Sequence, residues 1–206
     1  MEPLDVALYK LTPYEAIDIS KLGTENFSDL SGYDWAAEDI RKVASFGIVN
    51  TIGENRFGPG RNITRGDFAM FLIRTLGLSA KFEENFADVD EKAYFAKEVA
   101  IGRALGILKG VEENKFSPYA EITRQDMMTI CYRGLQIAGK ATNPDISLLQ
   151  RFPDKALIRD YAKEAISAMA NAGIVKGNPD GNINPFGNTT RAEAAVIMCR
   201  ILNAFD

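Results

Sequence analysis

Residues 190–193 read Thr-Arg-Ala-Glu, and two altered copies of this tetrapeptide occur earlier, as Thr64-Arg65-Gly66-Asp67 and Thr123-Arg124-Gln125-Asp126. The arginine of each copy lies 18 residues after a glycine that ends an apolar run: Gly47, Gly106 and Gly173. A proline falls six residues before each arginine, and a second arginine nine residues after it: Pro59, Pro118, Pro185, Arg74, Arg133 and Arg200. This agreement in spacing identifies three tandem repeats.

The repeats begin with similar tripeptides, which are Phe27-Ser28-Asp29, Phe86-Ala87-Asp88 and Phe152-Pro153-Asp154. We therefore predict three units at 27–80, 86–140 and 152–206, with a polar link from Gly139 to Gln150 before the third. Residues 1–26 form a leader segment outside the repeats, with a short helix expected near 14–22.

Each copy is typical of a helix–loop–helix unit. The first helices are predicted near 34–46, 93–105 and 160–172, each followed by its glycine as a left-handed C-cap. In the turn-rich loops, Asn55 and Asn114 replace Gly181, and asparagine also tolerates positive φ. The second helix begins at the threonine, where Thr-x-x-Glu or Thr-x-x-Asp resembles a capping box; aspartate reaches back less well than glutamate.

The second helices contain uncharged, mostly apolar runs at 68–73, 127–132 and 194–199. A helix that is apolar on nearly all sides belongs in the interior. One repeat cannot cover such a helix, so we predict a mainly α fold. Three helix–loop–helix repeats pack in it as a pseudo-threefold trimer around a central three-helix bundle.

Composition excludes several classes of function. The chain of 206 residues has no histidine, which removes Ser-His and Cys-His catalysis and His-ligated zinc. Its 24 Lys and Arg against 28 Asp and Glu give a formal charge of −4, which argues against nucleic-acid binding. Cys131 and Cys199 lie in apolar helical runs and are expected to be buried free thiols. No stretch is long enough to span a membrane.

Together, the Phe-x-Asp start, the Gly-Ile-Val helix end, the Phe-x-Pro loop and Ile-Thr-Arg-x-Asp/Glu resemble the S-layer homology (SLH) module. The resemblance covers about 180 of the 206 residues in three tandem copies. It implies non-covalent anchoring of a bacterial surface protein to the cell wall. The ligand it implies is a secondary cell wall polysaccharide, commonly pyruvylated, which binds in grooves between neighbouring modules of a spindle-shaped pseudo-trimer.

Arg65, Arg124 and Arg191 are the first candidate ligand-binding residues, because each occupies position N1 of an apolar helix. The helix dipole disfavours a cation there, so helix stability does not explain the choice of arginine. Beside free helix N–H groups, the guanidinium could receive a carboxylate, and the resemblance favours this role. The alternative is an ion pair between repeats. We expect Arg124→Ala and Arg191→Ala to weaken glycan binding with little loss of stability.

Three aspartates and three aromatic residues occupy equivalent positions in the copies. Asp29, Asp88 and Asp154 could accept sugar hydroxyls or orient the arginines, or could support a turn. Trp35, Tyr94 and Tyr161 could stack on a sugar ring. Aromatic residues at a helix start more often pack against the core, which is the role we expect here.

Gly110 and Gly177 could let the loop backbone approach the glycan closely, or could simply serve a turn that needs positive φ. Copy one has Thr51 at this position, and a β-branched residue does not easily adopt positive φ. The first loop is therefore expected to differ from the other two. We expect fewer than three equivalent tight glycan sites, and the groove that uses the Thr51 loop should bind most weakly.

Metal and hydrolase sites find little support. Read as a calcium loop from Asn178, the third loop lacks the glycine at position 6 and the bidentate glutamate at position 12. No pair of carboxylates repeats in the manner expected of a glycoside hydrolase. We expect no cofactor, no metal and no enzyme activity.

The sequence thus predicts a monomeric carbohydrate-binding anchor whose partner is a cell wall glycan, with no nucleic acid and no membrane insertion. The alternative is a helical-repeat scaffold on the cell envelope that binds a protein. Residues 1–5 lack the features of a signal peptide, whereas the resemblance implies an exported, extracellular protein at the cell wall or S-layer.

Overall fold

The computed structural model describes residues 27–140 and 143–204, and the leader helix expected near 14–22 lies outside these ranges. The described residues form six α-helices and two 3-10 helices, and their only β pairing consists of isolated bridges. The mainly α fold class is confirmed. The pseudo-threefold symmetry stays a prediction.

The first helices of the three repeats are α1 (Asp34–Ser45), α3 (Ala96–Ala104) and α5 (Asp160–Asn171). The second helices are α2 (Arg65–Thr75), α4 (Arg124–Ile137) and α6 (Arg191–Ala204), and each starts directly after its threonine. Helix α3 starts at Ala96 rather than at the expected Ala93. The 3-10 helices η2 (Ile146–Arg151) and η3 (Lys155–Leu157) lie before α5.

The threonine caps form as predicted. Thr64, Thr123 and Thr190 accept hydrogen bonds from the amide three residues on, at 3.1, 3.3 and 3.2 Å. Glu193 also reaches back to the Thr190 amide at 2.8 Å, which completes a capping box in the third repeat. In the other two repeats the acid is an aspartate, whose side chain is too short to accept a hydrogen bond from the threonine amide. These aspartates accept hydrogen bonds from tyrosine hydroxyls instead.

Left-handed residues end the helices and shape the loops. Gly47, Gly106 and Gly173 have φ of 67°, 70° and 71°, which confirms the predicted C-caps. Asn55 and Asn114 have φ of 53° and 55° where Gly181 has 82°, so asparagine does substitute for glycine at this turn.

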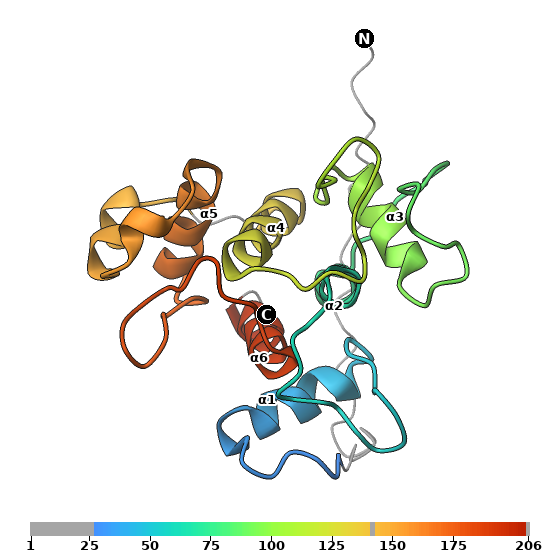
Figure 1. Ribbon diagram of the computed structural model, residues 1–206, viewed down its shortest axis with the longest axis horizontal. Helices are drawn as coiled ribbons and strands as arrows, with labels where there is room; N and C mark the ends of the chain where they lie inside the picture. Colours follow the sequence, from blue (N-terminus) through green and yellow to red (C-terminus); the bar gives the residue numbers. More distant parts are fainter. Residues whose placement is uncertain (1–26, 141–142, 205–206) are drawn as a thin grey trace.

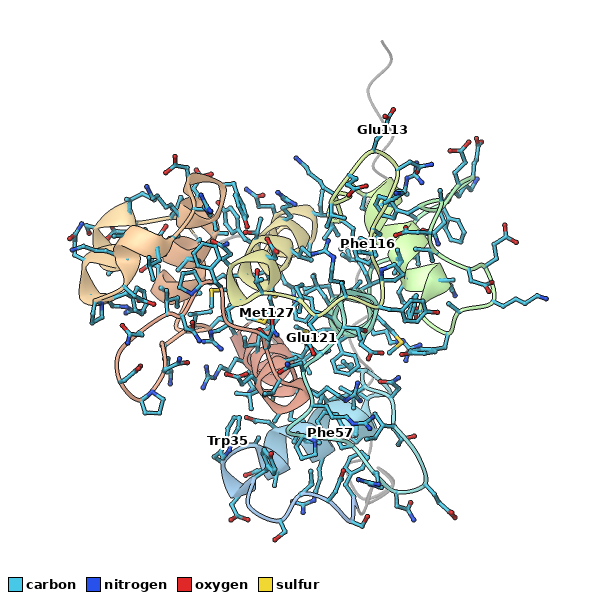
Figure 2. All side chains as sticks on the ribbon, viewed as in Figure 1. Trp35, Phe57, Glu113, Phe116, Glu121 and Met127 are labelled. Carbon is cyan, nitrogen blue, oxygen red and sulfur yellow. The ribbon has the colours of Figure 1, made fainter. Side chains whose placement is uncertain are left out.

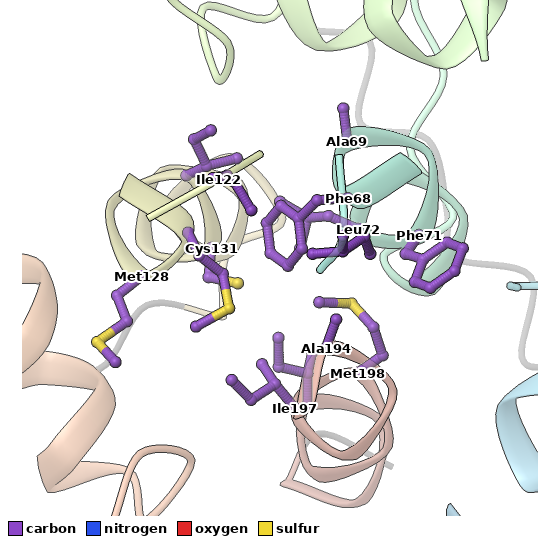
Figure 3. Packing of buried hydrophobic residues seen from close by; sticks show 14 of the residues in the cluster. Phe68, Ala69, Phe71, Leu72, Ile122, Met128, Cys131, Ala194, Ile197 and Met198 are labelled. Carbon is purple, nitrogen blue, oxygen red and sulfur yellow. The ribbon is translucent and has the colours of Figure 1, made fainter. Parts of the chain in front are cut away.

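Helices α2, α4 and α6 lie together in the middle of the molecule and are surrounded by α1, α3 and α5 (Figure 1). Phe68 of α2, Cys131 of α4 and Met198 of α6 extend into the space between the central helices (Figure 3), and all three side chains are buried. Cys131 and Cys199 are buried free thiols, as expected.

Each outer helix packs mainly against the central helix of the preceding repeat. Helix α3 contacts α2, α5 contacts α4, and α1 contacts α6, so the first repeat is packed against the third. The chain therefore closes on itself rather than forming an open stack, and a packed lobe contains helices from two sequence repeats.

A ring of three backbone hydrogen bonds joins the residues that precede the threonine caps. The Ile63 amide donates to Thr189 O (2.8 Å), the Ile122 amide to Ile63 O (3.2 Å), and the Thr189 amide to Ile122 O (3.3 Å). The Ile63, Ile122 and Thr189 side chains are all fully buried. Among the described residues, the Thr189 hydroxyl is a buried polar atom with no hydrogen-bond partner.

Replacing Thr189 by valine is expected to stabilise the protein by about 1 kcal/mol. The change keeps the shape of the side chain and removes a buried hydroxyl that makes no hydrogen bond, whose desolvation costs about 1–3 kcal/mol. Chemical denaturation measures the difference, with Thr129→Val as the control. The Thr129 hydroxyl donates to Gln125 O at 2.7 Å, so its loss should not stabilise. Equal or lower stability of Thr189→Val would show that the hydroxyl is satisfied.

Candidate functional site

Two cavities occupy equivalent places at the edges of the central bundle. The first groove, of about 450 Å³, is lined by loop residues 50–52, by α2 and by Tyr94 from the second repeat. The third groove, of about 570 Å³, is lined by residues 174–179, by α6 and by residues from the start of the first repeat, including Trp35. The equivalent position around Asp126 and Tyr161 is called the second groove, on the strength of the repeated sequence. Both cavities are lined by residues from more than one repeat.

The three N1 arginines reach into the following repeat, and the third reaches into the first. Their Nε atoms donate to the carbonyls of Phe116, Ile183 and Phe57 at 2.9, 2.8 and 2.9 Å for Arg65, Arg124 and Arg191. Each also faces an N3 acid of that repeat. The nitrogen–oxygen distances are 4.0 Å to Asp126, 2.8 Å to Glu193 and 3.3 Å to Asp67. The arginines thus join repeats, which is the alternative considered from the sequence.

The helix N–H groups beside these arginines are not free to bind a ligand. The Arg65 and Gly66 amides donate to Ala120 O and Pro118 O, both at 2.8 Å. The same pair of bonds caps the other two central helices, from Arg124 and Gln125 and from Arg191 and Ala192. The helix N–H groups therefore do not take part in a carboxylate site, because the proline loop of the next repeat accepts their hydrogen bonds. Ligand binding by the arginine side chains stays a prediction.

Arg191 has the most complete set of contacts, and its side chain is only 2% exposed. Its Nη2 donates to the backbone and side-chain oxygens of Asn50 at 2.6 and 3.1 Å. Its guanidinium lies 4.8 Å from the Phe57 ring centroid. Burial lowers the pKa of Arg191, and Asp67 partly offsets this. The geometry identifies Arg191 as the arginine that faces the Thr51 loop.

The aspartates Asp29, Asp88 and Asp154 hold their own loops in place. Each carboxylate accepts hydrogen bonds from two successive backbone amides. For Asp88 the donors are the amides of Phe116 and Ser117, at 2.8 and 2.7 Å. Asp29 accepts from Phe57 and Gly58, and Asp154 from Ile183 and Asn184. The turn-supporting role is thus the one that their geometry provides, and it fixes the loops that receive the arginines.

The aromatic residues do not pack in the core, so that expectation is wrong. Trp35, Tyr94 and Tyr161 are 59%, 58% and 53% exposed (Figure 2 labels Trp35). The hydroxyls of Tyr94 and Tyr161 donate to the N3 aspartates Asp67 and Asp126, both at 2.6 Å. Burial and the bond to Asp67 raise the pKa of Tyr94 to about 12, and burial and the bond to Asp126 raise the pKa of Tyr161. The rings lie outside because the apolar face of each helix begins at the next residue.

The loop glycines serve the loops themselves. Of Gly110, Gly177 and Thr51, only Gly177 has a positive φ, of 83°. A Cβ at Gly110 would lie 2.6 Å from the carbonyl oxygens of Glu112 and Lys115, within the same loop. All three loops keep an equivalent closing bond, such as Ile52 N to Arg56 O at 2.9 Å. The first loop therefore shares its backbone pairing with the others, contrary to expectation, and differs in its side chains.

Apart from Arg124, the cations that line the grooves were not among the candidates chosen from the sequence. Arg74 and Arg200, at the second repeated arginine position, line the first and third grooves, and Arg133 occupies the equivalent place. Lys176 also lines the third groove. The signal was present in the constant nine-residue spacing. It was read only as evidence of repetition, because nothing local shows that this turn of the helix faces the groove.

Within residues 27–140 and 143–204 there is no cluster of three His, Cys, Asp or Glu side chains that could hold a metal ion. The Asp180 carboxylate of the third loop accepts from the Asn182 backbone amide at 3.0 Å and side chain at 2.9 Å. In the same ranges, every helix is too short or too polar to cross a membrane.

Comparison with known proteins decides the family. A family model described as the S-layer homology domain matches residues 26–69, 85–128 and 151–195. The chain belongs to the S-layer homology family. This membership supports a role in cell wall anchoring in general. Each match begins one residue before the phenylalanine that opens a repeat and ends within α2, α4 or α6.

Several curated proteins share this SLH region. The chain is 30% identical over 190 residues to an amylopullulanase of Thermoanaerobacterium thermosulfurigenes, covering 92% of this chain and 10% of the relative. It is 29% identical to exoglucanase XynX of Acetivibrio thermocellus, covering 85% and 16%. It is 27% identical to a surface-layer 125 kDa protein of Lysinibacillus sphaericus, covering 88% and 15%. The chain spans about a sixth or less of the length of these relatives.

Proposed function

We propose that these three SLH repeats anchor a surface protein non-covalently by binding a secondary cell wall polysaccharide in the grooves between repeats. The observation that carries this proposal is the third groove. An exposed tryptophan, Trp35, stands there beside the cationic side chains of Arg124, Lys176 and Arg200. This combination suits a sugar that carries a negative charge.

The chemistry of the third groove matches the two faces of such a sugar. The apolar ring face stacks on the indole of Trp35, which is free to accept it because the side chain is 59% exposed. Ile174, Val175 and Val196 provide further apolar surface. A ketal-linked pyruvate places a carboxylate on the sugar, and the guanidinium groups of Arg124 and Arg200 are suitable partners for it.

The anchor is a non-catalytic, monomeric module that acts outside the cell at the wall or S-layer. Amylopullulanase and exoglucanase XynX are enzymes by name, but the chain matches only 10% and 16% of their lengths. The same region also occurs in a surface-layer protein, so attachment rather than one reaction is the property that these proteins have in common.

Wall sacculi from an SLH-bearing bacterium provide the test, prepared with and without hydrofluoric acid, which strips the secondary polymer. We expect the protein to sediment with untreated sacculi and to stay in solution with stripped sacculi. Trp35→Ala should weaken sedimentation. Phe82→Ala should not, because Phe82 is also an exposed aromatic residue, 45% accessible, but lines neither groove.

Equal sedimentation with stripped sacculi would contradict polysaccharide binding. If protease treatment of the sacculi then abolished it, the scaffold alternative would take its place, because the partner would be a protein.

A further inference from the structure

The three grooves share one plan but differ at the aromatic residue and the acid that face each other. In the first and second grooves these are Tyr94 with Asp67 and Tyr161 with Asp126, each pair joined by a 2.6 Å hydrogen bond. Each bond crosses from the start of an outer helix to the start of the central helix beside it. The two grooves are therefore bridged by a tyrosine–aspartate pair.

The third groove has Trp35 and Glu193 at these places. Both oxygens of Glu193 are bound elsewhere, one by the Thr190 amide at 2.8 Å and the other by Arg124 Nη1 at 2.8 Å. No hydrogen bond joins Trp35 to Glu193 in the described part of the chain. The capping box thus keeps the Glu193 carboxylate at the start of α6, and no side-chain bridge closes the groove between the Trp35 indole and α6.

A second difference concerns the residue after the repeated proline. It is Tyr119 in the second repeat and Phe186 in the third, but Gly60 in the first. The Tyr119 ring lies 5.5 Å from that of Phe95, next to Tyr94, and is thus placed beside the first groove. Gly60 lines the third groove together with Thr190 and Arg124, whereas the equivalent Tyr119, Thr64 and Arg191 do not line the first. The missing side chain leaves room for the Tyr33 hydroxyl, and Tyr33 lines the third groove together with Gly60.

A third difference is charge. In the third groove Arg124 pairs with Glu193 at 2.8 Å, whereas Lys176 and Arg200 form no ion pair within the described residues. In the first groove Asn50 replaces the lysine, and Arg74, the arginine that lines it, pairs with Glu98 at 2.8 Å. An anionic ligand therefore gains more in the third groove than in the first.

From these three differences we infer that the third groove is the dominant glycan site of this chain and takes one anionic sugar residue, and that Gly60 sets its depth. The inference rests on the proposed function. The second groove, which has Lys109 and Arg133 but a tyrosine–aspartate bridge, ranks next, and the first groove binds most weakly.

Trp35 provides a direct readout, because it is the only tryptophan of the chain. The probe is a ketal-pyruvylated N-acetylhexosamine methyl glycoside, titrated in parallel by calorimetry and by tryptophan fluorescence. We expect the fluorescence change to saturate together with the tightest calorimetric site, at one glycoside per chain. A tightest site that saturates without a change in Trp35 fluorescence would overturn the inference, as would three sites of equal affinity.

Gly60→Tyr introduces the side chain that the second repeat has at this position. A side chain here would displace the Tyr33 hydroxyl, and Tyr33 packs against the core and lines the third groove, so the unfolding of the variant is measured beside its affinity. We expect at least tenfold weaker binding at the tightest site, with helix content and melting temperature close to those of the parent. Gly53→Tyr is the control, because a Cβ at this exposed glycine meets nothing within 4 Å. Unchanged affinity of folded Gly60→Tyr would contradict the depth role.

The two levels of the proposal fail in different ways. If neither the glycoside nor untreated sacculi bind the parent protein, the proposed function falls, and the inference falls with it. If sacculi and glycoside bind but Trp35 and Gly60 have no part in the tightest site, only the inference is wrong.

Discussion

Truncation after Gln150, which removes the third repeat, is expected to unfold the remaining chain rather than leave two folded repeats. Helix α1 would lose α6, the helix against which its buried face packs. The Ile63 amide would lose its acceptor on Thr189, and Asp67 would lose Arg191. Open repeat arrays tolerate the loss of an end repeat because each repeat contacts only its neighbours. Here the last repeat is also a neighbour of the first.

Far-UV circular dichroism and guanidinium unfolding of the truncated chain, beside the full chain, measure this effect. We expect helix content far below two thirds of the parent value and no cooperative transition. A cooperative transition with about two thirds of the parent m-value would show that two repeats fold without closure, since m scales with the surface exposed on unfolding.

Arg191→Ala is expected to destabilise the protein by about 3–5 kcal/mol, because removing one partner of a buried ion pair leaves the other charge uncompensated. Asp67 is only 8% exposed and would lose its arginine partner. The Phe57 carbonyl and Asn50 would also lose their donor. The earlier expectation that this substitution leaves stability unchanged is therefore withdrawn.

Thermal and denaturant unfolding measure the effect, which corresponds to a loss of melting temperature on the order of 10 °C for a chain of this size. Arg41→Ala on the exposed side of α1 is the control and should change stability by less than about 0.5 kcal/mol. Arg191→Lys should recover only part of the loss, since lysine cannot reproduce several guanidinium bonds at once. If Arg191→Ala lowered the free energy of unfolding by less than about 1 kcal/mol, Asp67 would have found another partner.

Features that depend on neighbouring residues could be predicted from the sequence. The threonine caps, the left-handed glycines at helix ends and the asparagines at positive φ all follow from local backbone chemistry. The difference between Glu193, which completes a capping box, and Asp67, which does not, was also predictable from the length of the side chain.

Features that depend on which repeat packs against which could not be predicted. Periodicity shows that α1 has an apolar face but not that α6, at the far end of the sequence, covers it. The role of Arg191 as a buried link required knowing that Asn50, Phe57 and Asp67 surround it. Trp35 was placed in the core because an aromatic residue near an apolar face gives no local sign of its orientation.

The packing of each outer helix on the central helix of the preceding repeat has a consequence for how such proteins evolve. Duplication or recombination exchanges a stretch of sequence, such as one Phe-x-Asp to Thr-Arg repeat. Such a stretch carries half of each of two lobes, so the incoming copy must suit both of its new neighbours. If a copy of the second repeat replaced the third, the aspartate equivalent to Asp126 would face Trp35 in place of Glu193. Sequence change is therefore constrained where neighbouring repeats contact each other, and residues that contact one another across such a junction are expected to change in pairs.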